Sequence, residues 1–176
     1  MYKIAINAGH APYGIPDPGA VNNNLNLREC DVARNIAFAL SAMLEGSGYE
    51  TMIIQDDDLQ IICDNSNGFE ADYFISLHCN DYVNIQAHGS EVYCYTFGGE
   101  GEQLARSIQT RLVRDMKMSD RGVREANFYV LRHTECPAVL VEMGFINNPQ
   151  DADKLMNNQD DFAEAIYQGV IMYLEG

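Results

Sequence analysis

Short apolar runs alternate with long helical stripes along almost the whole chain, and this alternation restricts the folds open to it. Apolar residues at helical spacing predict helices over 29–45, 104–116 and 162–174, with a short helix after the cap Asn148 and Pro149. The runs between them predict strands at 4–8, 49–54, 73–78, 91–96, 128–132 and 138–142. The interleaving indicates one α/β domain over residues 1–176, with a mostly parallel mixed sheet of about six strands and helices on both faces.

Charge and cysteine content exclude several classes of protein. The 11 Lys and Arg residues against 26 Asp and Glu residues give a net charge of −15, which disfavours binding to nucleic acid or to anionic lipid. No apolar run approaches the roughly 20 residues that span a bilayer, and we expect neither a signal peptide nor a membrane anchor. The five cysteines form no C-x-x-C pair and are expected to be reduced.

Three of the predicted strands end at, or just before, a side chain that can bind a metal or move a proton. These side chains are His10, His78 and Glu142. In open α/β sheets, ligands bind beyond the carboxyl ends of the strands, so the three could meet at one edge. Glu29 lies three residues before Val32 on the apolar stripe of the first predicted helix and is expected to face inward.

Two histidines and an inward glutamate form a ligand set typical of catalytic zinc, which leaves one position open for water. Glu142 ends an apolar run, so burial should raise its pKa toward neutrality and suit it to act as a general base. Each residue also has a structural interpretation. His10 and His78 could be half-buried histidines, Glu29 could form a capping box with Asn26, and Glu142 could pair with an arginine such as Arg124.

Other potential metal ligands fit the pattern less well. Cys30 and Cys79 are soft donors beside two of the proposed ligands, but their spacing turns them away from Glu29 and His78. His88 precedes a glycine and His133 lies in a predicted turn, so both are expected to be solvated loop residues.

The chain resembles the zinc-dependent N-acetylmuramoyl-L-alanine amidases of the amidase_3 type almost from end to end. The segments that carry the resemblance are Asn7-Ala8-Gly9-His10, Asp17-Pro18-Gly19-Ala20, the strand from Ala71 to Asn80 and the strand from Pro137 to Phe145. The resemblance implies a phosphorylase/hydrolase-like fold, zinc bound by His10, Glu29 and His78, and Glu142 as the catalytic carboxylate. The implied reaction is hydrolysis of the amide between the lactyl group of N-acetylmuramic acid and L-alanine in peptidoglycan.

Some positions depart from the family pattern without removing a ligand. Asn7 stands where an aspartate is frequent, Ala11-Pro12-Tyr13 replaces a usual glycine pair, and Gln55 and Ile62 stand where arginines are frequent. Contacts to the carboxylates of the stem peptide are therefore expected to differ. Asn80, which shares a strand face with His78, and Arg124 are the expected substrate contacts.

Two other functions remain open at this stage. A zinc peptidase or carboxypeptidase could use the same ligand set on the stem peptide, and a non-catalytic module could bind peptidoglycan without turnover. For the amidase we expect a monomer that acts on the wall outside the cytoplasmic membrane, as a phage endolysin or as part of a bacterial autolysin or sporulation amidase. The net charge of −15 should oppose its encounter with anionic walls, so added salt should raise the rate on them; a fall in the rate would instead indicate a local basic patch, with Arg121 and Arg124 as the first candidates.

Overall fold

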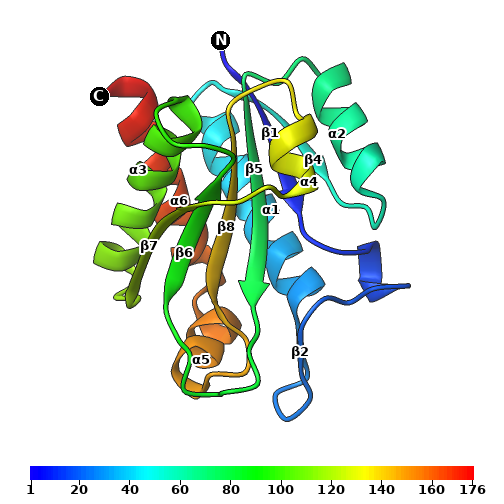
Figure 1. Ribbon diagram of the computed structural model, residues 1–176, viewed down its shortest axis with the longest axis vertical. Coiled ribbons are helices and arrows are strands. Elements are labelled where there is room, and N and C mark those ends of the chain that lie inside the picture. The colour runs from blue at the N-terminus through cyan, green and yellow to red at the C-terminus, as the bar shows by residue number, and fades with distance from the viewer.

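The computed structural model describes all 176 residues, which form a single α/β domain around one six-stranded sheet (Figure 1). The strand order is β4-β1-β5-β8-β6-β7. β1, β4, β5 and β8 are parallel, whereas β6 and β7 run in the opposite direction to β8. The strands are β1 (Lys3–Ala8), β4 (Glu50–Ile54), β5 (Tyr73–Asn80), β6 (Ser90–Cys94), β7 (Asp120–Glu125) and β8 (Ala138–Phe145).

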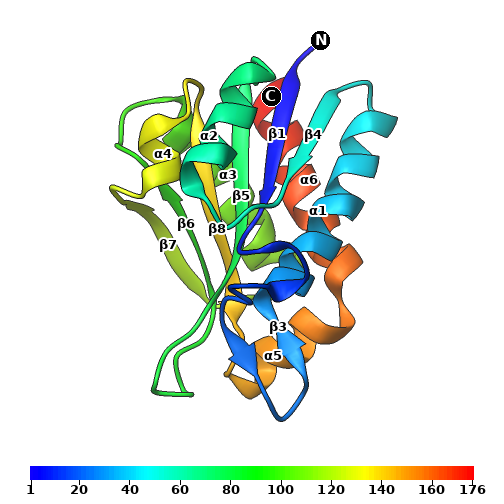
Figure 2. The same cartoon turned by 90° about the vertical axis from the view of Figure 1, so that its right-hand side faces the viewer.

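Helices cover both faces of the sheet, as the two views show (Figures 1 and 2). α1, α3 and α6 pack on one face over the larger apolar core, while α2 and α4 lie on the other face over a smaller one. The helices are α1 (Glu29–Gly46), α2 (Leu59–Gly68), α3 (Glu100–Asp115), α4 (Tyr129–His133), α5 (Pro149–Asn157) and α6 (Gln159–Glu175), with a short 3₁₀ turn at Pro12–Gly14. None of them combines the length and the apolar character that crossing a bilayer requires.

The smaller core lies near the amino ends of the central strands. It contains Ala5 of β1, Phe74 of β5, and Ala138 and Leu140 of β8, packed under residues of α2 and α4 such as Ile62. The next residues along β5 and β8 on this face are polar, and include His78 and Glu142. This side of the sheet therefore changes from apolar packing to polar side chains toward the carboxyl ends of β5 and β8.

Most of the predicted elements are confirmed, including the central position of β8 and the cap of α5, where the Asn148 side chain accepts from the amides of Gln150 and Asp151. The strand predicted at 128–132 is wrong. Residues 129–132 belong to helix α4, Phe128 is its N-cap, and the sixth strand is β7. A run of four apolar residues is too short to show a period that separates helix from strand. The helix α2 and the small hairpin of β2 (Val21–Asn22) and β3 (Leu27–Arg28) were not predicted.

Candidate metal centre

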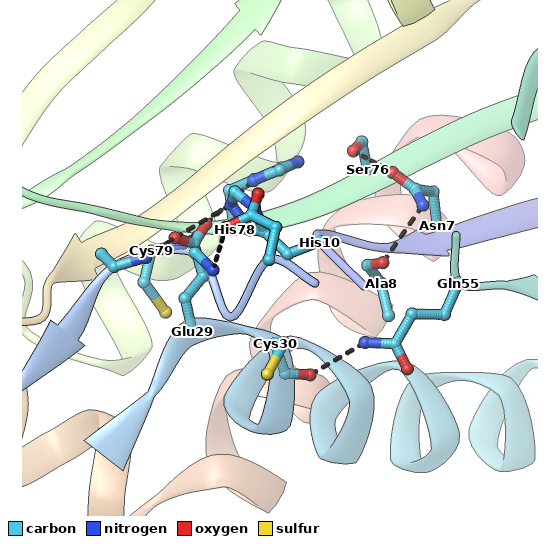
Figure 3. A network of polar contacts seen from close by, with 12 residues as sticks. Asn7, Ala8, His10, Glu29, Cys30, Gln55, Ser76, His78 and Cys79 are labelled. Carbon is cyan, nitrogen blue, oxygen red and sulfur yellow. Dashed lines mark hydrogen bonds and ion pairs between the residues drawn. The ribbon is translucent and has the colours of Figure 1, made fainter. Parts of the chain in front are cut away.

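His10, Glu29 and His78 converge although 68 residues separate the first from the last. His10 follows β1, His78 lies on the neighbouring strand β5, and Glu29 is the first residue of α1. Glu29 Oε2 lies 3.1 Å from His10 Nε2, and Glu29 Oε1 lies 2.9 Å from His78 Nδ1. One ligand atom from each residue lies within 4.8 Å of the others, and Figure 3 shows the three side chains meeting.

Glu29 is buried in this cluster and does not cap its helix, so the capping-box interpretation is wrong. The N-cap residue of α1 is Arg28, and its side chain makes no capping bond. Glu29 is only 3% exposed and also accepts hydrogen bonds from the backbone amides of Ala20 (2.8 Å) and Cys79 (3.0 Å). Burial alone would raise the pKa of Glu29, but its hydrogen bonds with the two histidines lower that pKa well below its usual range.

Asp17 holds the ring of His10 from the side opposite Glu29. Its Oδ2 lies 2.7 Å from His10 Nδ1, which leaves Nε2 directed at the cluster. Burial lowers the pKa of His10, but its bonds with Glu29 and Asp17 outweigh burial and raise the pKa to about 9. Metal-binding histidines often have such a carboxylate partner. The sequence analysis gave Asp17 no role, although it lies in one of the segments that resemble the family.

Two glycines, Gly9 and Gly19, have no side chain where the cluster lies, and this makes room for its three residues. A Cβ on Gly19, whose φ is +69°, would lie 2.4 Å from the His10 ring and 2.5 Å from Glu29 Oε2. A Cβ on Gly9 would lie 2.4 Å from the His78 ring. Both distances are far shorter than van der Waals contact, so any larger residue would displace the proposed ligands.

The other histidines and the cysteines lie outside the cluster, as predicted. Cys79 packs in the larger apolar core, and Cys30 is buried at the start of α1. All five cysteines are free thiols. His88 is exposed in a loop, whereas His133 is exposed but ends helix α4 and is not in a turn.

Glu142 stands beside the cluster on the next strand. It is the register partner of His78 across β5 and β8, so both side chains project from the same face of the sheet. Burial raises the pKa of Glu142 to about 7, and its Oε2 has no hydrogen-bond partner. Glu142 makes no ion pair with Arg124, so the structural interpretation offered for Glu142 from the sequence is wrong. Glu142 is half-buried, and a carboxylate oxygen without a partner is available to accept a proton from a substrate or from water.

Arg124 and Asn80 instead meet at Glu91, a residue that the sequence analysis did not identify. Glu91 Oε2 lies 3.0 Å from Arg124 Nε and 3.3 Å from Arg121 Nε, and Asn80 Nδ2 donates to Glu91 Oε1 at 2.8 Å. Glu91 is the register partner of Glu142 across β8 and β6. His78, Glu142 and Glu91 therefore form one row across three neighbouring strands.

A cavity of about 360 Å³ lies against the metal cluster. His10, His78 and Asp17 line one side, and Tyr129 of α4 with Leu59 and Ile62 of α2 line the other. Ile62 is buried in the smaller core. Gln55 donates to the Cys30 carbonyl at 3.0 Å (Figure 3). Gln55 and Ile62 thus supply no cation here.

The donor set fits a divalent metal with nitrogen and oxygen preferences. Two imidazole nitrogens and one carboxylate make three protein ligands, which is the number found at catalytic zinc sites. The His10 ring is already oriented by Asp17, and the two glycines keep the centre clear of side chains. The three residues therefore form a candidate site for such a metal.

The chain is similar to known N-acetylmuramoyl-L-alanine amidases. The family model described as N-acetylmuramoyl-L-alanine amidase matches residues 4–172. The chain is 34% identical over 178 residues to the N-acetylmuramoyl-L-alanine amidase LytC of Bacillus subtilis, covering 97% of this chain and 35% of that protein. It is 32% identical over 176 residues to the sporulation-specific N-acetylmuramoyl-L-alanine amidase of Bacillus subtilis, covering 96% of this chain and 65% of that protein.

The fold likeness extends over the whole domain. The structure of the N-acetylmuramoyl-L-alanine amidase AmiC2 of Nostoc punctiforme superposes with a TM-score of 0.90 at 31% identity, covering 99% of this chain and 98% of that one. The chain thus spans less than two thirds of the length of both Bacillus relatives and nearly all of the solved Nostoc chain. With a family model matching nearly every residue, this chain belongs to the Amidase_3 family of N-acetylmuramoyl-L-alanine amidases.

Proposed function

We propose that this chain is a zinc-dependent amidase of peptidoglycan, which hydrolyses the amide between N-acetylmuramic acid and L-alanine. The observation that supports this most is the placement of Glu142, whose buried Oε2 has no hydrogen-bond partner, in register with His78 of the His10–Glu29–His78 cluster. Membership of the family and the names of the relatives support the same reaction.

In this proposal His10, Glu29 and His78 hold one zinc ion and leave at least one position open. When bound, zinc acts as a Lewis acid that polarises the amide carbonyl and makes water more acidic. We expect elemental analysis to find one zinc per chain. A structure of the loaded protein should show bonds of about 2.0 to 2.2 Å, with neither Cys30 nor Cys79 as a ligand.

Glu142 is proposed to move the proton. Its carboxylate takes a proton from water as the water oxygen adds to the lactyl carbonyl carbon, and it then gives that proton to the nitrogen of L-alanine as the C–N bond breaks. The products are the lactyl carboxylic acid on the glycan and a stem peptide with a free amino terminus. A pKa of about 7 lets the group both accept and donate near neutral pH.

The substrate lies in the cell wall, so the proposed site of action is outside the cytoplasmic membrane. The relatives include the N-acetylmuramoyl-L-alanine amidase LytC and a sporulation-specific amidase, both of Bacillus subtilis. Either a bacterial or a phage origin is compatible with the proposal. We further propose that residues 1–176 act as one catalytic domain and as a monomer.

The test is to digest purified peptidoglycan from several bacteria with the zinc-loaded protein and to identify the released ends by mass spectrometry. Glu142→Gln serves as the matched control for contaminating hydrolases. We expect whole stem peptides that begin with the free amino group of L-alanine. Trimmed stems still attached to the glycan would indicate a peptidase, and binding without release would indicate a non-catalytic module.

A further inference from the structure

The second cluster, made of Glu91, Arg121, Arg124 and Asn80, lies beside Glu142 on the side away from the metal ligands. The row of register partners runs from His78 on β5 through Glu142 on β8 to Glu91 on β6, and β7 with its two arginines follows. Neighbouring strands lie about 4.8 Å apart. The strand that carries the arginine pair therefore lies two strands from the strand of the proposed general base, with Glu91 on the strand between them.

Glu91 fixes both arginines in place. It is only 2% exposed, and both guanidinium groups direct their Nε atoms at its Oε2. The guanidinium of Arg121 also lies 4.8 Å from the centre of the Phe145 ring, and Arg124 Nη2 donates to the Arg121 carbonyl at 3.5 Å. Contacts on several sides hold the two side chains in defined positions, which reduces the entropy lost when a ligand binds.

The cluster keeps donors and a positive charge. Two guanidinium groups against one carboxylate leave a net charge of +1, in a chain whose overall charge is −15. No contact engages the Nη atoms of Arg121, and the side chains of Arg121 and Arg124 are 32% and 52% exposed. A guanidinium with free Nη donors suits a carboxylate, which it can bind through two parallel hydrogen bonds.

We propose that Arg121 and Arg124 bind a carboxylate of the stem peptide, and that this contact makes the enzyme selective for peptides that carry that charge. This inference rests on the proposed amidase function. The lactyl carboxyl of muramic acid is consumed in the scissile amide, so the anion belongs to the peptide. An extended peptide covers about 3.5 Å per residue, and the carboxylate on the residue directly after L-alanine therefore reaches the arginine pair.

The experiment compares two soluble muramoyl dipeptides that differ in one group. Both contain L-alanine followed by D-glutamate with its γ-carboxyl capped as the methylamide, and the α-carboxyl is free in one and amidated in the other. We expect the zinc-loaded protein to cleave the acid with a kcat/KM about tenfold higher than the amide, which is the size expected for one charge-assisted hydrogen bond. Equal values for the two substrates would overturn the proposal.

Substitutions of Arg121 and Arg124 test whether these two residues cause the preference for the acid substrate. Arg124→Gln and Arg121→Gln should reduce the ratio of kcat/KM for the acid to kcat/KM for the amide from about tenfold toward one. Arg106→Gln is the control, because Arg106 is an exposed residue that pairs with Glu102 on α3. An equal loss on both substrates, in variants with an unchanged melting temperature, would contradict the assignment. Arg124→Lys keeps a charge beside Glu91 and provides a second measurement if the glutamine variants fold poorly.

The inference and the proposed function fail in different ways. If the zinc-loaded protein cleaves neither substrate, the amidase proposal itself is wrong. Calorimetric titration with the acid and the amide then still tests the arginine pair. Tighter binding of the acid that disappears in Arg124→Gln supports the pair as a carboxylate site, and equal affinities contradict it.

Discussion

The molecule contains two clusters of similar plan and different chemistry. In each, one glutamate that is almost fully buried joins two basic side chains: Glu29 with His10 and His78, and Glu91 with Arg121 and Arg124. Imidazole can give up its ring proton to become a metal ligand, whereas guanidinium stays charged in proteins. The first cluster can therefore exchange protons for a metal, and the second can only keep a fixed charge.

The largest effect should follow from changing the carboxylate at the centre of the first cluster. Glu29→Gln removes the anionic ligand and is expected to abolish zinc binding and peptidoglycan hydrolysis. Loss of a partner outside the ligand set already costs about 10 to 100-fold in metal affinity, so loss of a ligand should cost more. Elemental analysis and turnover measure the two effects.

The same substitution at two other glutamates tests whether the loss of zinc is specific to the first cluster. Glu164→Gln, at an exposed position on α6, should leave metal content and turnover at the wild-type level. Glu91→Gln should keep one zinc per chain because Glu91 contacts no proposed ligand. Loss of zinc from the Glu91 variant would show that the clusters are not independent.

Glu142→Gln should have the next largest effect. The amide keeps the shape of the side chain and removes the base, so we expect zinc and fold to remain while turnover falls about 100-fold or more. Circular dichroism, zinc content and release of stem peptides are the measurements. A variant that digests peptidoglycan at the wild-type rate would make Glu142 a structural residue and contradict the mechanism.

Asp17→Asn should have a smaller effect that added metal reverses. The amide can still bond to His10 but lacks the charge that strengthens the ligand, so zinc affinity should fall by about 10 to 100-fold. Competition with a chelator measures the affinity, and turnover in excess zinc should return close to the wild-type rate. Asp160→Asn, an exposed change at the start of α6, is the control. An unchanged zinc affinity in the Asp17→Asn variant would show that Asp17 does not support the binding of the metal.

The smallest effect concerns the long-range field. The net charge of −15 should oppose encounter with anionic walls, while the arginine pair acts only at short range. Raising the ionic strength to about 0.15 M shortens the Debye length to about 8 Å, and the initial rate on intact walls should rise about twofold. A short neutral muropeptide should show little change. A steady fall in the rate on walls would indicate that the positive pair dominates encounter.

The metal centre was predictable because its parts follow local rules. His10, His78 and Glu142 end or follow apolar runs, and parallel strands bring their carboxyl ends to one edge. Glu29 could be placed on the inward face of α1 from its spacing alone. The resemblance then reduced the alternatives for each residue.

The second cluster could not be predicted in this way. Glu91 meets Glu142 only because β6 runs antiparallel to β8 with one particular register, and neither direction nor register is encoded in the periodicity of a strand. The segment 128–132 was also ambiguous, because its four apolar residues fit either a strand or the helix α4. Contacts between residues far apart in the sequence therefore decide the strand direction, the register and the helix α4, which the local sequence pattern does not specify.

The position of β7 at the edge of the sheet affects how such an enzyme can diversify. Substitutions at Arg121 and Arg124 change partly solvated side chains on a strand with one neighbour, whereas Glu142 lies on a strand that is paired on both sides. Mutations at the edge therefore disturb little packing. Descendants of this chain can acquire new peptide preferences through β7 while the hydrolytic residues on β5 and β8 are inherited unchanged.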